Sequence, residues 1–154
     1  MDSYILMNKQ LVAMLEGERN IISNLSNASA LLNENLDRIN WVGFYLYDKK
    51  SNALKLGPFQ GKVACTNIPM GKGVCGTAAH LRETIVVEDV HKFEGHIACD
   101  AASNSEIVVP IIVKGEIYGV LDVDSPIFSR FNDVDKKYLE EFVSILEGAI
   151  ANGI

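Results

Sequence analysis

Three cysteines are the most reactive side chains in this sequence, and their spacing fits no common metal or redox motif. Cys65, Cys75 and Cys99 are 10 and 24 residues apart, so no two of them form a C-x-x-C pair. An odd number of cysteines also argues against a framework of structural disulfides. Two interpretations stay open at this point. The cysteines are small buried apolar side chains, or one is a nucleophilic thiol with a second as its redox partner.

Two aspartates could form an acid cluster near the end of a predicted strand. Asp122 and Asp124 are two residues apart, so in a strand they project from one face together with Tyr118 and Val120. Two carboxylates so close repel each other, which raises the pKa of one of them. Such a group can stay protonated near neutrality and act as an acid. The alternative is a pair of strand-end acids that face solvent.

Glu106 can join these aspartates only if the predicted hairpin is irregular. A strict two-residue turn at Lys114–Gly115 would place Glu106 on the face opposite Asp122. If Glu106 belongs to the site, we therefore predict an odd-length turn or a β-bulge near Pro110. The strands of this hairpin are predicted over Ile107–Val113 and Glu116–Asp124.

Two aromatic residues share one face of an earlier predicted strand. Trp41 and Tyr45 are four residues apart, which puts both rings on the same side. Packing in the core or in an interface is one explanation. The other is an aromatic wall against an apolar or cationic part of a ligand.

A glycine motif, Gly71-Lys72-Gly73-Val74-Cys75-Gly76, matches G-x-G-x-x-G. A dinucleotide site is not favoured, because the preceding residues do not resemble a buried parallel strand and the following helix is short. A tight turn that lets the backbone approach another group closely fits better. Amide groups at the start of the following helix could also bind an anion or depress the pKa of Cys75.

A predicted loop over His91–Asn104 carries two histidines and one of the cysteines. His96 and Cys99 have the spacing of metal ligands, but a zinc site would need Cys65 or Cys75 to complete it. The alternatives are histidines that hydrogen-bond locally, or a thiol whose pKa a neighbour adjusts. We predict no metal.

The rest of the chain supplies elements that could position these residues. Helical periodicity covers the first third with a break near Gly17, and a final helix from Asp133 to Ala151 is capped by Asn132 or Asp133. Tight turns between neighbouring strands predict antiparallel pairing and an α+β domain. Further strands are predicted over Trp41–Tyr47, Ala53–Phe59 and Thr84–Val87, and a short helix over Val74–Leu81.

Composition and charge limit the class of protein. A chain of 154 residues fits one domain, and its formal net charge of −6 disfavours nucleic acid and anionic membranes as partners. Met1–Asn20 lacks the basic start and long apolar stretch of a signal peptide. No run reaches the roughly 20 apolar residues that span a bilayer. We therefore expect a cytoplasmic protein whose thiols are kept reduced.

Taken together, these segments resemble the free methionine-R-sulfoxide reductases, a family built on the GAF domain. The resemblance extends along nearly the whole chain and includes all three cysteines, which GAF domains in general do not share. The matching segments are Asn40–Tyr45, Gly57–Gly61, Cys65, Gly71–Gly76, Gly95–Asp100, Ser105–Val108 and Leu121–Pro126.

The resemblance implies one GAF domain over residues 1–154, with a central antiparallel sheet of about six strands flanked by N-terminal and C-terminal helices. It implies reduction of the R epimer of free methionine sulfoxide, not of a residue within a protein. It also implies thioredoxin as the electron donor, a homodimer and no cofactor.

Among the cysteines, the resemblance implies that Cys99 attacks the sulfoxide sulfur, which leaves methionine and a cysteine sulfenic acid. Cys65 is implied as the resolving thiol, with Cys75 as the competing candidate. The resulting intramolecular disulfide is then reduced by an external dithiol. Because carboxylates nearby disfavour a thiolate, the site needs a donor close to Cys99, such as a backbone N–H or His96.

The other implied roles belong to the acids and the aromatic residues. Glu106, Asp122 and Asp124 match the acids that hold the substrate's ammonium group and sulfoxide oxygen, and Glu106 and Asp124 are also expected among the catalytic residues. A neutral carboxylic acid can give the sulfoxide oxygen the proton that makes its sulfur electrophilic. Trp41 and Tyr45 match a wall around the methyl-sulfur group.

Other functions remain open from the sequence. A non-catalytic GAF module that binds a small molecule or senses redox state is the main alternative. A metal-binding regulatory domain and a peroxide sensor with a resolving thiol are the others.

Overall fold

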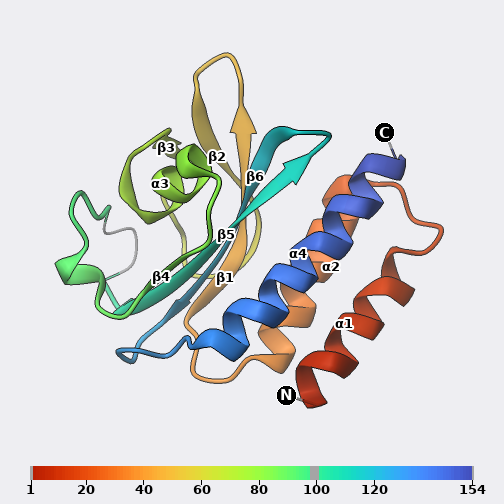
Figure 1. The fold of residues 1–154 in the computed structure, drawn as a ribbon, viewed down its shortest axis with the longest axis horizontal. Helices are drawn as coiled ribbons and strands as arrows, with labels where there is room; N and C mark the ends of the chain where they lie inside the picture. Colours follow the sequence, from red (N-terminus) through yellow and green to blue (C-terminus); the bar gives the residue numbers. More distant parts are fainter. Residues whose placement is uncertain (1, 98–100, 154) are drawn as a thin grey trace.

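The computed structural model describes residues 2–97 and 101–153, which form an antiparallel sheet with helices on both faces (Figure 1). The strand order is β3-β2-β1-β6-β5-β4. The strands are β1 (Trp41–Asp48), β2 (Ala53–Gly61), β3 (Asn67–Pro69), β4 (Ile85–Val87), β5 (Ser105–Val113) and β6 (Glu116–Ser125). The helices are α1 (Asp2–Leu15), α2 (Ile21–Asn35), α3 (Gly73–Leu81) and α4 (Asp133–Gly153), with a short 3-10 helix η1 (Val90–Lys92).

This arrangement confirms the α+β class and the antiparallel sheet of six strands. The helical break near Gly17 is also confirmed, because α1 ends at Leu15 and Gly17 has a φ of +80°. Asn132 is the residue that caps α4: its side-chain oxygen accepts the N–H groups of Val134 and Asp135 at 3.0 Å. None of the described helices is long and apolar enough to cross a membrane.

Some predicted boundaries were wrong. The short strand β3 was not predicted, because three residues that include a proline give no alternating pattern. Thr84 lies before β4 rather than in it, and its hydroxyl donates to Glu140. The predicted loop over His91–Asn104 overlaps η1 at its start. The remaining elements extend one or two residues beyond their predicted ends.

One face of the sheet packs against α2 and α4, and α1 packs against these two helices (Figure 1). Strand positions such as Phe44, Ile107 and Leu121 are fully buried there, against Leu32 of α2 and Phe142 of α4. This larger core accounts for the period-two pattern of β5 and the helical pattern of α4. It forms a rigid support behind the opposite face of the sheet.

The opposite face packs against α3 and carries the residues singled out as reactive. Trp41 and Tyr45 of β1, Val108 of β5 and Val120 of β6 are buried against α3, which contributes Cys75. The sequence pattern predicted a common face for the two aromatic residues, and the structure confirms it.

A β-bulge in the β5–β6 hairpin decides where Glu106 lies. The two-residue turn is regular, with Lys114 and Gly115 both at positive φ, as a type I′ turn requires. The register then shifts between Ile111 and Ile112, which leaves Tyr118 as an extra residue on β6.

Because of this bulge, Glu106 pairs with Asp124 rather than with Val123, and its side chain faces the same way as that of Asp122. The predicted irregularity is confirmed. The bulge also corrects one prediction: Tyr118 packs against the core on the helical face, whereas Val120 lies on the α3 face.

The glycine motif fixes α3 against β3. Gly71 and Gly73 have φ values of +80° and +62°, which form the tight turn before the helix. A side chain at Gly76 would place its Cβ 2.5 Å from the carbonyl oxygen of Pro69. Because β3 is an antiparallel edge strand and not a central parallel one, a dinucleotide site of the Rossmann type is excluded.

We expect the substitution Gly76→Ala to destabilise the chain by about 1–3 kcal/mol, because the added methyl group would force α3 away from β3. The matched control is Gly148→Ala in α4, where an added Cβ meets nothing within 4 Å. The control should be neutral or stabilising by up to about 1 kcal/mol. Urea unfolding of both variants measures the difference, and equal effects would contradict this account of the α3 packing.

Candidate active site

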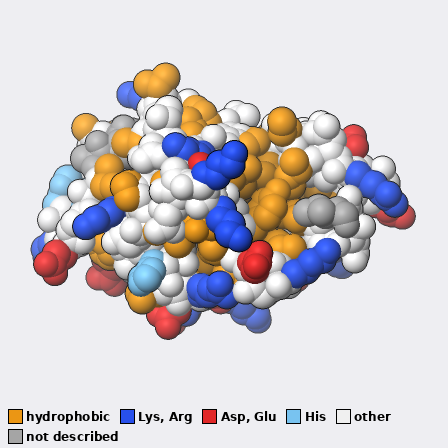
Figure 2. Space-filling model, turned by 90° about the horizontal axis from the view of Figure 1, so that it is seen from above, with side chains coloured by type: hydrophobic (Ala, Val, Ile, Leu, Met, Phe, Trp, Pro, Cys, Tyr) orange, Lys and Arg blue, Asp and Glu red, His pale blue; other side chains and the backbone are white. Residues whose placement is uncertain are grey.

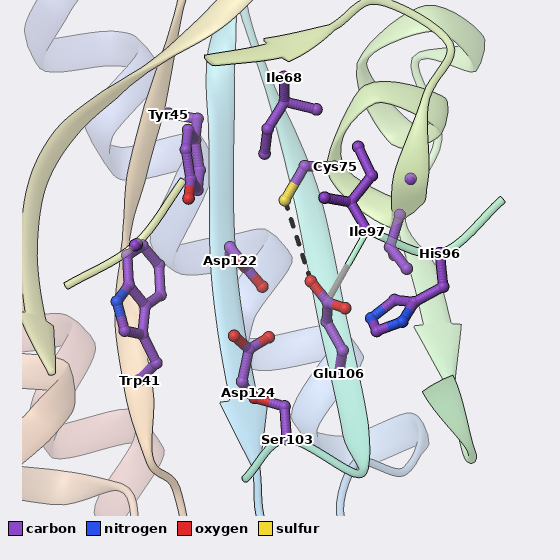
Figure 3. A pocket seen from close by; sticks show the side chains of 13 residues that line it. Trp41, Tyr45, Ile68, Cys75, His96, Ile97, Ser103, Glu106, Asp122 and Asp124 are labelled. Carbon is purple, nitrogen blue, oxygen red and sulfur yellow. Dashed lines mark hydrogen bonds between the residues drawn. The ribbon is translucent and has the colours of Figure 1, made fainter. Parts of the chain in front are cut away.

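A pocket lies between the sheet and α3, and it contains most of the residues that the sequence singled out (Figure 3). β1, β5 and β6 form its floor, and the first turn of α3 forms one side. His96 and Ile97 approach from the segment that follows η1. The lining residues are Trp41, Tyr45, Ala64, Ile68, Gly73, Val74, Cys75, His96, Ile97, Ser103, Glu106, Asp122 and Asp124.

The floor of the pocket holds three buried carboxyl groups. Glu106, Asp122 and Asp124 are only 6%, 5% and 9% exposed. The pKa of Asp122 lies well above its usual range, because burial disfavours the charged form and the carboxylates of Asp124 and Glu106 repel a further negative charge. The expected acid cluster is therefore present, and the raised pKa of Asp122 favours its neutral form.

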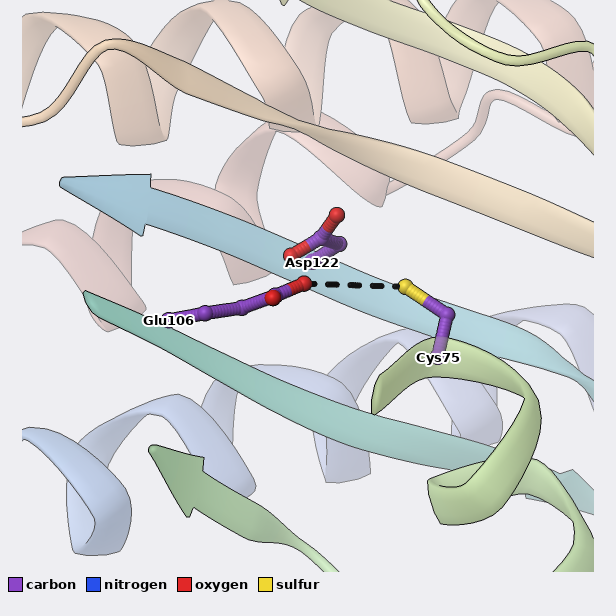
Figure 4. A group of neighbouring side chains, drawn as sticks. All are labelled: Cys75, Glu106 and Asp122. Atoms are coloured by element: carbon purple, nitrogen blue, oxygen red, sulfur yellow. Dashed lines mark hydrogen bonds between the residues drawn. The ribbon is translucent and has the colours of Figure 1, made fainter. Parts of the chain in front are cut away.

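Cys75 points from α3 at the acid cluster (Figure 4). Its thiol donates to Oε2 of Glu106, with 3.9 Å between sulfur and oxygen. Burial and the neighbouring acids Asp122, Glu106 and Asp124 raise the pKa of Cys75 well above its usual value. The suggestion that the start of α3 depresses this pKa was therefore wrong. The field of a short helix is weaker than the effect of burial beside three acids.

An aromatic wall stands opposite Cys75. The Trp41 ring stacks on Tyr45 and on Phe59, with centroid distances of 5.8 and 5.1 Å. The Trp41 indole N–H donates to the carbonyl oxygen of Lys62, and the Tyr45 hydroxyl donates to that of Cys65. These bonds fix both rings and leave their apolar faces toward the pocket.

The Tyr45 bond also holds the segment that contains Cys65 at the edge of the pocket. Ala64, the neighbour of Cys65, lines the pocket, and Cys65 is partly exposed. Cys75, by contrast, is a buried free thiol. Cys99 and Asp100 lie outside the described residues, although Ile97 and Ser103 on either side of them line the pocket.

Comparison with known proteins gives a consistent answer. A family model described as GAF domain matches residues 13–151. The free methionine-R-sulfoxide reductase of Escherichia coli is 53% identical over 148 residues, which cover 96% of this chain and 88% of that protein. A solved structure of fRMsr of Staphylococcus aureus in complex with substrate is 59% identical, with a TM-score of 0.91 over 96% of this chain and 95% of that one.

This chain belongs to the free methionine-R-sulfoxide reductase family. The same family includes the enzyme from Neisseria meningitidis, solved in complex with its substrate. That structure is 43% identical and has a TM-score of 0.95, over 97% of this chain and 89% of that one. The resemblance drawn from the sequence motifs is confirmed, as are the GAF fold and membership of a family of oxidoreductases.

In this member of the free methionine-R-sulfoxide reductase family, some pocket residues were not singled out as candidate site residues from the sequence. Ser103 lies beside Asp124, and its hydroxyl accepts a hydrogen bond from the side chain of Asn40. Ile68 and Ile97 close the apolar side. No periodic pattern places these residues at the pocket, because they reach it from the unpredicted strand β3 and from loops.

The donor atoms that could hold a metal are Cys75 Sγ and one oxygen each of Glu106 and Asp122, which lie within 4.8 Å of one another. This is the one such group among residues 2–97 and 101–153. Metal ligands must lose their protons, yet the raised pKa values of Cys75 and Asp122 favour the protonated forms. The group is therefore better suited to donating hydrogen bonds than to binding a metal ion.

The pKa of Asp122 leads to a prediction about stability. The folded chain holds this proton more tightly than the unfolded chain, whose pKa is near 3.8. The associated stability is fully present below about pH 4 and is lost as the pH rises through the folded-state pKa. Asp122→Asn keeps the shape of the neutral acid but cannot ionise. The unfolding free energy of this variant should therefore fall less between pH 4 and pH 8 than that of the parent chain.

Urea midpoints measured across that range provide the test, and at pH 8 the variant should have the higher midpoint. The control is Glu116→Gln, an exposed acid on the same strand, which should keep the slope of the parent chain. If Asp122→Asn and the parent lose stability in parallel, Asp122 is not the buried neutral acid.

Proposed function

We propose that this chain reduces free methionine-R-sulfoxide to methionine through a thiol mechanism. The observation that carries the proposal is the set of three buried carboxyl groups facing an aromatic wall, where burial and the neighbouring acids raise the pKa of Asp122. The names and substrate complexes of the relatives support the choice of substrate.

Each part of the substrate has a matching group in the pocket. The ammonium group of a free amino acid binds the carboxylates of Glu106 and Asp124, because a buried cation needs paired negative charge. The methyl-sulfur group packs against Trp41 and Tyr45. A residue within a protein carries no ammonium group, so the acids favour the free amino acid.

Asp122 supplies the proton that the reaction needs. A sulfoxide sulfur is a poor electrophile until its oxygen is protonated, and a carboxylic acid with a raised pKa still carries its proton at neutral pH. This assignment makes Asp122 the general acid, and it leaves Glu106 and Asp124 to bind the substrate and keep that proton in place.

The electrons come from cysteine. The Cys99 thiolate attacks the sulfoxide sulfur, and the protonated oxygen leaves as water. Water then attacks the Cys99 sulfur and breaks the new sulfur–sulfur bond, which gives methionine and a Cys99 sulfenic acid. The Cys65 thiol then attacks this sulfenic sulfur, which forms a disulfide and releases water. A thioredoxin dithiol reduces the disulfide and is itself oxidised.

Cys65 suits the resolving step better than Cys75. Cys65 is partly exposed, and the hydrogen bond from Tyr45 keeps its segment beside the pocket. Cys75 is 4% exposed and its raised pKa keeps it a thiol, so it is a poor nucleophile at neutral pH. In this proposal Cys75 donates a hydrogen bond to Glu106 and takes no part in the redox steps.

A homodimer is also part of the proposal. Apolar side chains gather on the face seen in Figure 2. A groove between α1 and α4 is lined by Val12, Leu15, Glu16, Ile145 and Ala149, and Val12 is 53% exposed. A second copy of the chain would bury this apolar surface.

The direct test measures NADPH oxidation in the presence of thioredoxin, thioredoxin reductase and one epimer of free methionine sulfoxide. We expect turnover of the R epimer and none of the S epimer. Asp122→Asn should lower kcat/KM by about a hundredfold or more, the usual contribution of a general acid. A chain that binds the R epimer without turnover would be a sensor, and the enzymatic proposal would be wrong.

The cysteine roles are tested by single turnover without an external reductant. The reduced parent should release one equivalent of methionine. Cys65→Ser should also release one, because the first step needs only Cys99, but it should accumulate a sulfenic acid that dimedone labels. Cys99→Ser should release none. Cys75→Ser is the matched control and should release one equivalent without labelling, whereas labelling in that variant would identify Cys75 as the resolving thiol.

A further inference from the structure

The proposed substrate is a free amino acid, and the charge of the pocket suits its ammonium group but not its carboxylate. This mismatch exists only if the proposed function is correct. Three carboxyl groups line the pocket, and they suit an ammonium group. A free amino acid also carries a carboxylate, which the same acids repel. The described lining residues include no lysine or arginine, so the partner of that carboxylate has to be found elsewhere.

Most side-chain donors of the pocket are already used. The indole N–H of Trp41 and the hydroxyl of Tyr45 donate to backbone carbonyl groups. The Cys75 thiol donates to Glu106. The Ser103 hydroxyl lies beside Asp124, among the acids.

Among the described lining residues, His96 is the remaining ring N–H donor, and it lies beside the acids. Its ring is next to the carboxyl group of Glu106 in Figure 3, which marks no hydrogen bond from it to the other residues drawn. The ammonium and carboxylate groups of an amino acid share one carbon atom, so their partners in a site must be neighbours. Glu106 and His96 form such a pair of neighbours.

The start of α3 adds to the attraction on the same side. Ile97, next to His96, packs on Gly73, where an added Cβ would lie 3.1 Å from Ile97 Cγ1. Gly73 is the first residue of α3, and the preceding Lys72 makes no side-chain cap. The amide groups of this first turn therefore give a positive potential beside His96.

We propose that His96 is a specificity residue that binds the α-carboxylate of the substrate through a ring N–H. Imidazole offers such a donor whether it is neutral or protonated. The acids and His96 together then bind both charged groups of a free amino acid: the acids bind its ammonium group, and His96 binds its carboxylate. A methionine sulfoxide residue inside a peptide has neither charged group at these positions.

The experiment compares two R-epimer substrates: free methionine sulfoxide and its α-carboxamide, which keeps the ammonium group but has no carboxylate. The parent should prefer the free acid. His96→Leu, which has no donor, should reduce this preference, measured as the ratio of the two kcat/KM values, by about tenfold or more, the usual value of a hydrogen bond to a charged group. The loss should fall on the free acid, with kcat/KM for the carboxamide nearly unchanged.

The control is His91→Gln. His91 lies in the same segment and contacts the side-chain oxygen of Asn104 at 3.0 Å, so this substitution disturbs the segment without removing a pocket donor. It should leave the ratio unchanged. If His96→Leu lowers both kcat/KM values equally, or keeps the preference, the inference is wrong. If the parent reduces neither substrate, the proposed function itself fails and the inference with it.

Discussion

Electrostatic repulsion among three buried carboxyl groups is the constraint on which the rest of this structure depends. Glu106, Asp122 and Asp124 share one face of one hairpin, with little solvent to separate their charges. The fold cannot bury three negative charges there, so at least one proton stays bound, and the raised pKa of Asp122 expresses this. A cluster that costs stability in the resting chain becomes favourable when a cationic ligand enters.

The bulge at Tyr118 is what keeps the three acids together. A regular hairpin would have turned Glu106 into the apolar core on the helical face, where a carboxyl group has no partner. The extra residue reverses the direction of the side chains partway along β6. It also places Tyr118 on the helical face and Val120 on the α3 face, so one irregularity determines which β6 residues lie on each face of the sheet.

The pocket also separates two thiol environments. Cys75 faces the acids and is kept protonated, whereas a nucleophilic sulfur must avoid their charge. A reactive cysteine is therefore better carried by the loop segments at the edge of the pocket than by α3. Tyr45 has two structural roles: its ring is part of the aromatic wall, and its hydroxyl group holds the segment that contains Cys65.

The sequence by itself determined the class of fold, the common face of Trp41 and Tyr45, the adjacency of Asp122 and Asp124, and the need for an odd-length turn or a bulge if Glu106 was to join them. These follow from periodicity, which is a local property of the chain. Only the tertiary structure decided where the bulge lies, that β3 exists, and that the pKa of Cys75 rises. The first two depend on strand pairing, and the pKa of Cys75 depends on burial and on acids of β5 and β6 that lie more than thirty residues away from Cys75, so no local pattern encodes them.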